Sequence, residues 1–405
     1  MSSEIKADKW SPASGTSATI GDSGDTYTVA SGATFNASSS NLANRPNAQP
    51  IIINGDMQVA QKATSKTGVT NGGFGIWTVD RINFTESGTM SAVLTITQES
   101  LTSGNAYTDG FSKAYKIDVT TADGSLAADD YYRTNYRIEG QDLQLFKKGT
   151  ANAEKITLAF WVKATKTGTN IVELNDNDNG RHCCASYTIS TTNTWEKKVL
   201  NFPADTTGAW DNDNGQSLRI NFILAAGSNY TSGTLDTTWA ANTTANIAVG
   251  QVNNFDSTSN NVHITGVQLE VGEYTSSTIP PFQHETNGEN LLRCQRYFRS
   301  YGGGDAFEQI SVGYNSTTTQ GATFIDYSSP VMRATPTLAV SANGDWKIYS
   351  VASGYECNGS MGASDATPRN MKIFTPHGGS ATVGNGCMLQ ADNTTNARLT
   401  LSAEL

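Results

Sequence analysis

The sequence predicts an all-β protein: a jelly-roll β-sandwich, a short helix and a second small β-sandwich, preceded by a short N-terminal anchoring segment. Many short stretches of β-branched and aromatic residues alternate with turn-rich stretches. The 38 glycines, together with abundant Thr, Ser and Asn, favour turns over long helices. A chain of 405 residues also exceeds what one hydrophobic core usually organises, so several domains are expected.

Residues 1–45 are poor in large apolar groups and alternate short β-like pieces with Gly-Asp and Ser-Gly turns. Such a segment cannot bury a core by itself. It either stays disordered or gains burial by pairing with other copies or with a partner surface. We expect Trp10, Tyr27 and Phe35 to contribute to that docking.

Residues 46–285 contain many short strand-like pieces and little helix, which favours a β-sandwich or jelly roll. The stretch "GVQLEVG" alternates cleanly, so Val267 and Leu269 should face the core while Gln268 faces water. We therefore predict a closing strand with one solvent-exposed face.

Residues 286–301 are predicted to form a linker helix. Pro280 and Pro281 end the preceding strand, because neither proline can donate a backbone hydrogen bond. In "NGENLLRCQRYF" the apolar positions Leu291 and Phe298 recur at helical spacing. This amphipathic helix should pack against a neighbouring domain.

Residues 302–405 are predicted to form a C-terminal β domain. They begin with three consecutive glycines and contain six strand-like pieces, and about 100 residues suffice for a small sandwich. The alternating end, "LTLSAEL", indicates that the last strand belongs to a sheet.

Composition excludes several partners. The formal net charge is −10 and no run of Lys or Arg could follow a phosphate backbone, so we expect no nucleic acid. The sequence contains no apolar run of about eighteen residues, so we expect no membrane insertion. The first ten residues carry charge where a secretory signal would be apolar. The five cysteines, which lack CxxC spacing, are expected to be reduced and buried.

Several strand-like pieces resemble the consecutive strands of jelly-roll carbohydrate-binding modules of families four, nine and twenty-two. They are Ile156 to Asp176, Thr192 to Asp205, Ser217 to Asn229 and His263 to Gly272, with Ile53 to Gln61 as the opening strand. The resemblance implies a glycan-binding jelly roll. Only Asp56 offers a carboxylate where those modules hold a structural calcium.

A closer resemblance covers nearly the whole chain. The combination "INGDMQVAQ … DYYRTNYRIEGQDL … GVQLEVG … PPFQHE … ENLLRCQRYF" is similar to tail-fibre and appendage proteins of bacteriophages, especially marine ones. The resemblance implies a virion protein, made in the host cytoplasm and located on the tail or particle surface. Its N-terminus would attach to other virion proteins and the rest would bind host-surface glycan, as a homo-oligomer that we expect to be a trimer.

Aromatic residues in polar loops are the predicted carbohydrate-binding residues. A sugar ring stacks on a flat aromatic face while nearby amides and carboxylates bond its hydroxyls. Trp210, Tyr230 and Trp239 lie among Asp, Asn and Thr, and Tyr132 joins them because Tyr131 and Tyr132 cannot both face inward on one strand. Burial of the two tryptophans is the alternative.

The string DNDNG occurs twice, at Asp176 to Gly180 and Asp211 to Gly215. Two edge turns are one interpretation, because Asn, Asp and Gly bond their own backbone. A structural calcium held by several loops is the other, with Asp176, Asp178, Asp211 and Asp213 as ligands. No other cofactor is expected.

The sequence shows no catalytic spacing: no nucleophile with a base, no GxSxG and no HExxH. We therefore expect a binding protein and not an enzyme. Two alternatives stay open. A structural virion protein, decorating the capsid or joining tail parts, would bury Trp210 and Trp239 against neighbouring chains, and a glycan depolymerase would pair two distant carboxylates in a groove.

Overall fold

The computed structural model describes residues 49–405 except 74. The predicted anchoring segment, with Trp10, Tyr27 and Phe35, therefore lies outside the described residues. By contacts the chain divides into Met1–Asn44 and Arg45–Leu405, and only the second unit is described below. No helix in its described part is long and apolar enough to cross a membrane.

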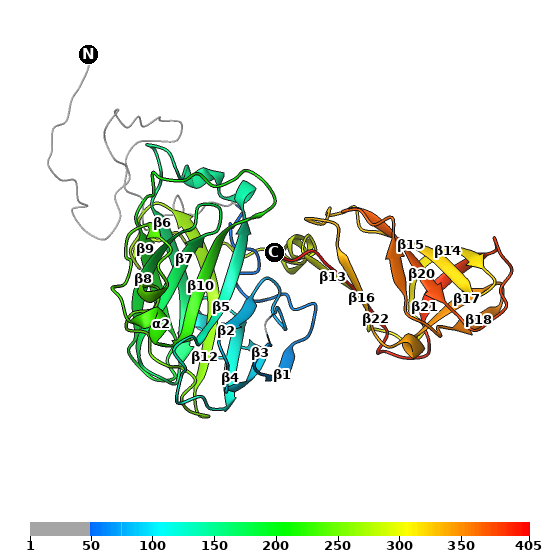
Figure 1. The fold of residues 1–405 in the computed structure, drawn as a ribbon, viewed down its shortest axis with the longest axis horizontal. Coiled ribbons are helices and arrows are strands. Elements are labelled where there is room, and N and C mark those ends of the chain that lie inside the picture. The colour runs from blue at the N-terminus through cyan, green and yellow to red at the C-terminus, as the bar shows by residue number, and fades with distance from the viewer. Residues whose placement is uncertain (1–48, 74) are drawn as a thin grey trace, which may run out of the picture. The chain divides into compact units, whose positions relative to one another are not determined.

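Two six-stranded antiparallel sheets form the first part of the chain (Figure 1). Sheet A has the order β1 (Ser65–Val69), β3 (Val93–Ser100), β4 (Lys113–Thr121), β12 (Asn261–Val271), β6 (Ile156–Ala164) and β9 (Glu196–Phe202). Sheet B has the order β11 (Ala240–Ala241), β8 (Arg181–Ile189), β7 (Gly168–Asp176), β10 (Gln216–Ala226), β5 (Tyr131–Glu139) and β2 (Asn83–Ser87). The predicted all-β jelly-roll sandwich is confirmed.

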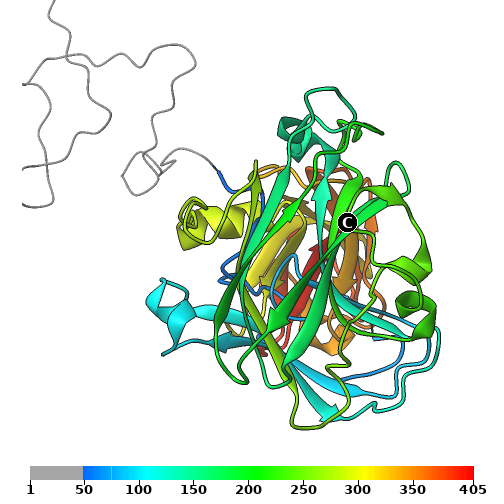
Figure 2. The ribbon, with the colours of Figure 1, turned by 90° about the vertical axis from the view of Figure 1, so that its left-hand side faces the viewer.

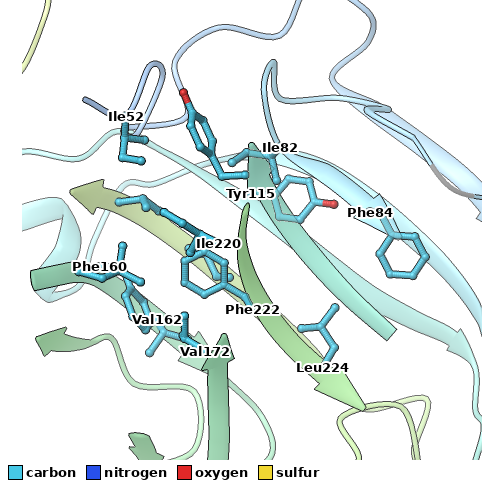
Figure 3. Packing of buried hydrophobic residues seen from close by; sticks show 14 of the residues in the cluster. Ile52, Ile82, Phe84, Tyr115, Phe160, Val162, Val172, Ile220, Phe222 and Leu224 are labelled. Carbon is cyan, nitrogen blue, oxygen red and sulfur yellow. The ribbon is translucent and has the colours of Figure 1, made fainter. Parts of the chain in front are cut away.

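The core of the sandwich is one cluster built from alternate residues of both sheets. Phe160 of β6 meets Phe222 of β10 edge to face, with ring centroids 5.0 Å apart. Val162, Val172 and Ile220 surround that pair (Figure 3). Each such side chain contributes roughly 1.5–3 kcal/mol when it leaves water.

A second layer covers part of the outer face of sheet B. The connection from β10 to β12 carries α2 (Ser228–Thr231) and the short turn η4 (Thr244–Asn246). Figure 2 shows the green turn of α2 outside the strands. A small apolar cluster beneath this connection includes Tyr131 and Ile223.

This layer corrects one prediction. Tyr131 and Tyr132 are neighbours on β5, yet both are buried, with 5% and 0% of their surface exposed. Tyr132 points into the sandwich core, while Tyr131 points outward into the covered cluster. Strand alternation holds, but here both faces of the strand are buried.

Strand β12 also departs from the predicted pattern. Val267 and Leu269 are buried as expected, but Gln268 is buried as well. The strand is irregular at Gly266, whose φ is +62°, and Gln268 donates to the carbonyl of Pro280 at 3.0 Å. The strand ends at Val271, before the proline corner, so the predicted role of Pro280 and Pro281 in ending it is wrong; the corner instead folds back so that Pro280 accepts the Gln268 side chain.

The predicted helix is present as α3 (Asn287–Cys294), with a capping box in which Thr286 and Glu289 bond each other's backbone. It is shorter than predicted. Phe298 does not continue the helix, because it begins β13 (Phe298–Gly302). Cys294 and Tyr297 join the core of the sandwich, so the helix packs on the preceding domain.

The C-terminal region contains two further antiparallel sheets and its own core around Trp346, Ile348 and Leu389. One sheet has the order β13, β22 (Arg398–Ser402) and β16 (Thr337–Val340). The other has the order β18 (Ser353–Glu356), β17 (Trp346–Ser350), β21 (Gly386–Ala391), β14 (Gln309–Thr317), β15 (Gln320–Asp326), β20 (Asn370–Pro376) and β19 (Gly362–Ser364). The last strand is paired, as the sequence predicts.

Short helical turns complete the described chain. They are α1 (Asn105–Thr108), η2 (Gly140–Asp142), η3 (Gln144–Phe146) and η5 (Asn343–Asp345). All five cysteines are buried and none forms a disulfide.

Candidate functional site

The two tryptophans predicted to bind sugar are core residues. Trp210 and Trp239 are 5% and 9% exposed and belong to the sandwich core. Trp210 packs edge to face on Phe146, and the Trp239 indole donates to the carbonyl of Pro203 at 2.8 Å. The prediction is wrong for both, because packed rings offer no open face to a sugar.

The two tyrosines differ from each other. Tyr132 is fully buried, stacks on Phe255 and donates its hydroxyl to Asp123, so its predicted sugar contact is also wrong. Tyr230 is half-buried and stacks on Tyr131 with ring centroids 4.4 Å apart. Of the four predicted aromatic residues, Tyr230 therefore keeps the most exposed surface.

The two DNDNG loops do meet. Asp178 accepts the backbone N–H of Asp211 at 3.0 Å, and Asp213 accepts that of Gly215 at 2.8 Å. The contact of Asp213 is that of an ordinary turn, whereas the contact of Asp178 joins the two loops. The interpretation of the repeats as edge turns thus accounts for Asp213, and Asp178 helps to hold the two loops together.

The fourth predicted calcium ligand, Asp176, forms a buried ion pair with Lys148. Asp176 is fully buried and accepts Lys148 Nζ at 2.6 Å, while Asp205 accepts the same ammonium group at 3.1 Å. This contact corrects the predicted ligand set, because Lys148 stands beside the carboxylate that a calcium would need. In residues 49–73 and 75–405, no three His, Cys, Asp or Glu side chains gather as metal ligands.

A set of polar residues that the sequence prediction missed lies on the outward-facing side of sheet B. We call it the arginine face. It consists of Asn83 in β2, Arg133, Asn135 and Arg137 in β5, Arg219 and Asn221 in β10, and Glu173 and Asn175 in β7.

Register and alternation place these residues together. Arg219 is directly opposite Arg137 and Asn221 is opposite Asn135 on the neighbouring strand. The intervening residues, such as Tyr136 and Ile220, belong to the core. Because side chains alternate along a strand, the arginines and asparagines point to the other face.

The three arginines repel one another. Burial lowers the pKa of Arg219, and the positive charge of Arg133 lowers it further. Burial also lowers the pKa of Arg137, with Arg219 and Arg133 adding to that shift. Like charges directly across a sheet are destabilising, so this cluster costs folding free energy.

Several buried polar atoms on the arginine face have no hydrogen-bond partner among the described residues. They are Nε and Nη1 of Arg133, Nε of Arg219, Oδ1 of Asn221 and Oδ1 of Asn83. Arg133 itself is only 8% exposed and its guanidinium lies 4.3 Å from the Tyr131 ring centroid. Each unsatisfied group costs about 1–3 kcal/mol. Such groups are expected where a water, an ion or a ligand supplies the missing partners.

The only carboxylate of the arginine face is already saturated. Glu173 accepts Asn221 at 2.7 Å and the Tyr131 hydroxyl at 3.2 Å, and it contacts His182 at 3.1 Å. The other nitrogen of His182 lies 2.9 Å from Asp236. Burial disfavours the imidazolium, but the bonds to Glu173 and Asp236 outweigh burial and raise the pKa of His182.

We expect replacement of His182 by Gln to destabilise the chain most at low pH. A raised folded pKa means that the imidazolium stabilises the fold fully below its unfolded pKa of about 6.5, and that this gain disappears as pH rises through the folded pKa. Urea unfolding of both proteins at about pH 5.5 and about pH 9 measures this. The buried His263, whose pKa is lowered by burial, is present in both proteins and cancels. An equal loss at both pH values contradicts the assignment.

A signal for the arginine face exists in the sequence. "RTNYR" in β5 and "RIN" in β10 place Arg or Asn at every second position, between residues that face the core. A polar alternation of this kind normally marks a solvated face. The informative difference is that these strands are central in their sheet and their polar residues are largely buried.

When the chain is compared with known proteins, the similarities found are to solved structures. No protein-family model matches the chain, and no curated protein matches it. The enzymatically active domain of tailspike protein 4 from bacteriophage CBA120 is 15% identical over 55% of this chain and 21% of its own, with a TM-score of 0.29.

Two carbohydrate-binding structures are also similar. The family 11 carbohydrate-binding module of a Clostridium thermocellum cellulase is 13% identical over 48% of this chain and 90% of its own, with a TM-score of 0.24. A tandem family 22 module from Paenibacillus barcinonensis is 10% identical over 79% of this chain and 91% of its own, with a TM-score of 0.24. At these identities and TM-scores the likenesses carry no argument about function, which is argued below from the residues of this chain.

Proposed function

We propose that the chain is a tail fibre-like appendage protein of a phage virion that binds host-surface glycan on its arginine face. The observation that carries the proposal is the set of buried donors and acceptors without partners on one face of sheet B. Guanidinium and amide groups arranged in this way suit a ligand rich in hydroxyl and acid oxygens. The resemblance of the sequence to phage appendage proteins supports the setting.

The proposed mechanism is binding without cleavage. Glu173, the one carboxylate of the arginine face, is held by His182, Asn221 and Tyr131 and has no free role as an acid or base. The N-terminal segment attaches the protein to other virion proteins. A trimer presents three sites, and linked sites raise avidity by about 10² to 10⁴ without new contacts.

A structural role in the virion is the second candidate, and one observation favours it. The C-terminal domain exposes Val312, Tyr314 and Phe324 on neighbouring strands, at 68%, 41% and 51% of their surface. An exposed apolar patch of this kind suits contact with another chain. The burial of Trp210 and Trp239 does not favour this candidate, because they are buried within their own chain.

The test is binding of the labelled full-length protein to an array of bacterial surface glycans. We expect the Arg133→Ala, Arg219→Ala double variant to lose at least about tenfold in affinity, because each arginine offers charge-assisted hydrogen bonds. Arg369→Ala is the matched control, since Arg369 is exposed on the C-terminal domain. Unchanged binding by the folded double variant contradicts the site, and no binding by the intact protein favours the structural role.

A further inference from the structure

We infer that the ligand of the arginine face is an acidic glycan, whose anionic group binds between Arg133 and Arg219. This inference rests on the proposed function and names the chemical class of the ligand. It concerns a carboxylate or a sulfate ester carried by the saccharide, since both present the same negatively charged oxygens.

The charges of the arginine face support an anion over a neutral sugar. Arg133, Arg137 and Arg219 contribute three positive charges, and Glu173 is the only negative charge within the set. Among the neighbouring acidic groups, Asp236 contacts His182 and Glu404 pairs with Arg81. Arg137 donates to the main-chain oxygen of Leu405, whereas Arg133 and Arg219 form no ion pair with the described residues. The face therefore keeps an excess of positive charge in a chain whose formal net charge is −10.

The available donors belong to the same two arginines. Arg133 has two nitrogens without an acceptor, and Arg219 has one. The remaining Arg219 contact is a long bond of 3.3 Å from Nη2 to Asn175. Hydrogen bonds from a guanidinium to an anionic oxygen are about twice as strong as neutral ones, so an acid group uses these donors best.

The neutral part of the saccharide also has partners. Oδ1 of Asn221 and Oδ1 of Asn83 are acceptors without donors, which suits sugar hydroxyls beside the acid group. Arg133 also contacts the Tyr131 ring, on which Tyr230 stacks. The half-buried Tyr230 is thus the predicted sugar-binding residue that lies nearest to this arrangement.

The experiment compares acidic polysaccharides with neutral counterparts, using the full-length protein. The probes are polygalacturonate, its carboxyl-reduced form, dextran sulfate and unmodified dextran, each tested by biolayer interferometry. We expect at least one acidic probe to bind about tenfold or more tightly than its neutral counterpart. The two pairs distinguish a carboxylate from a sulfate ester.

Charge-removing variants locate the effect. Arg133→Gln and Arg219→Gln are each expected to weaken binding of the acidic probe at least about tenfold, while Arg133→Lys retains part of it. Arg369→Gln removes the same charge at an exposed site and should change nothing. Because the arginines repel one another, the Gln variants are expected to fold, which thermal unfolding checks.

The outcomes separate this inference from the proposed function. Equal binding of an acidic probe and its neutral counterpart, or binding only of neutral probes, overturns the inference and leaves glycan binding in place. Acidic binding that both Gln variants retain in full also overturns it. Failure to bind these four probes and the array glycans alike overturns both proposals. The wild-type comparison stays decisive even where a variant fails to fold.

Discussion

Replacement of Lys148 by Met is expected to lower the free energy of unfolding by about 3–5 kcal/mol, because it leaves the buried carboxylate of Asp176 without a counter-charge, whereas Asp205 keeps its ion pair with Arg181. Lys148 is 6% exposed and bonds Asp176 and Asp205, and its ammonium group also donates to the carbonyls of Thr207 and Gly208. Methionine fills a similar volume, so the loss reports charge and hydrogen bonding more than packing.

Urea unfolding of wild type and variant at neutral pH measures this effect. Lys155→Met is the matched control, because Lys155 pairs with Glu273 in an ion pair of which both partners are more than half exposed. Exposed pairs contribute about 0–1 kcal/mol. A Lys148→Met loss no larger than that of the control contradicts the assigned role.

Replacement of Glu139 by Gln is expected to cost about 3 kcal/mol and to loosen α3 together with Arg296 and Tyr297, which follow it. Glu139 is fully buried in β5 and accepts two bonds from Arg296, at 2.8 and 2.7 Å. It also accepts the hydroxyl of Tyr297, whose ring lies 3.4 Å from the Arg81 guanidinium. The hydrogen bond to Glu139 raises the pKa of Arg296.

Glutamine removes the negative charge and turns one acceptor into a donor that faces Arg296. Urea unfolding measures the loss, and hydrogen exchange of the amides of α3 reports the loosening. Glu273→Gln serves as the control, since Glu273 is exposed. Unchanged exchange in α3 shows that Glu139 does not hold this segment.

Local sequence signals were sufficient for the fold class. Strand alternation and the helical spacing that begins at Leu291 each depend on neighbours within a few residues. The length of α3 was overestimated because Phe298 continues the helical spacing, although it pairs with Ser402 as the first residue of β13. That pairing joins residues about a hundred positions apart and has no local signal.

The prediction that Trp210 and Trp239 bind sugar was wrong because their burial depends on tertiary contacts. Trp210 and Trp239 lie in polar loops by sequence, but both pack around the buried ammonium group of Lys148, at 5.6 and 5.2 Å from their ring centroids. Lys148 lies about sixty residues before Trp210. Only the fold shows that the same lysine also balances Asp176.

Only part of the arginine face could be predicted from the sequence. Alternate Arg and Asn residues on two strands can be read from the sequence, but their register cannot. Arg137 and Arg219 are directly opposite each other although about eighty residues separate them along the chain. Nothing local shows that this face would gather three like charges and leave donors without acceptors.

A crystal structure of the full chain, soaked with the oligosaccharide that binds most tightly on the glycan array, tests the central claim most directly. We expect the saccharide on the arginine face, with oxygen atoms within hydrogen-bond distance of Arg133 and Arg219. A saccharide bound elsewhere, such as on Tyr314 and Phe324 of the C-terminal domain, with the arginine face unliganded, would contradict it.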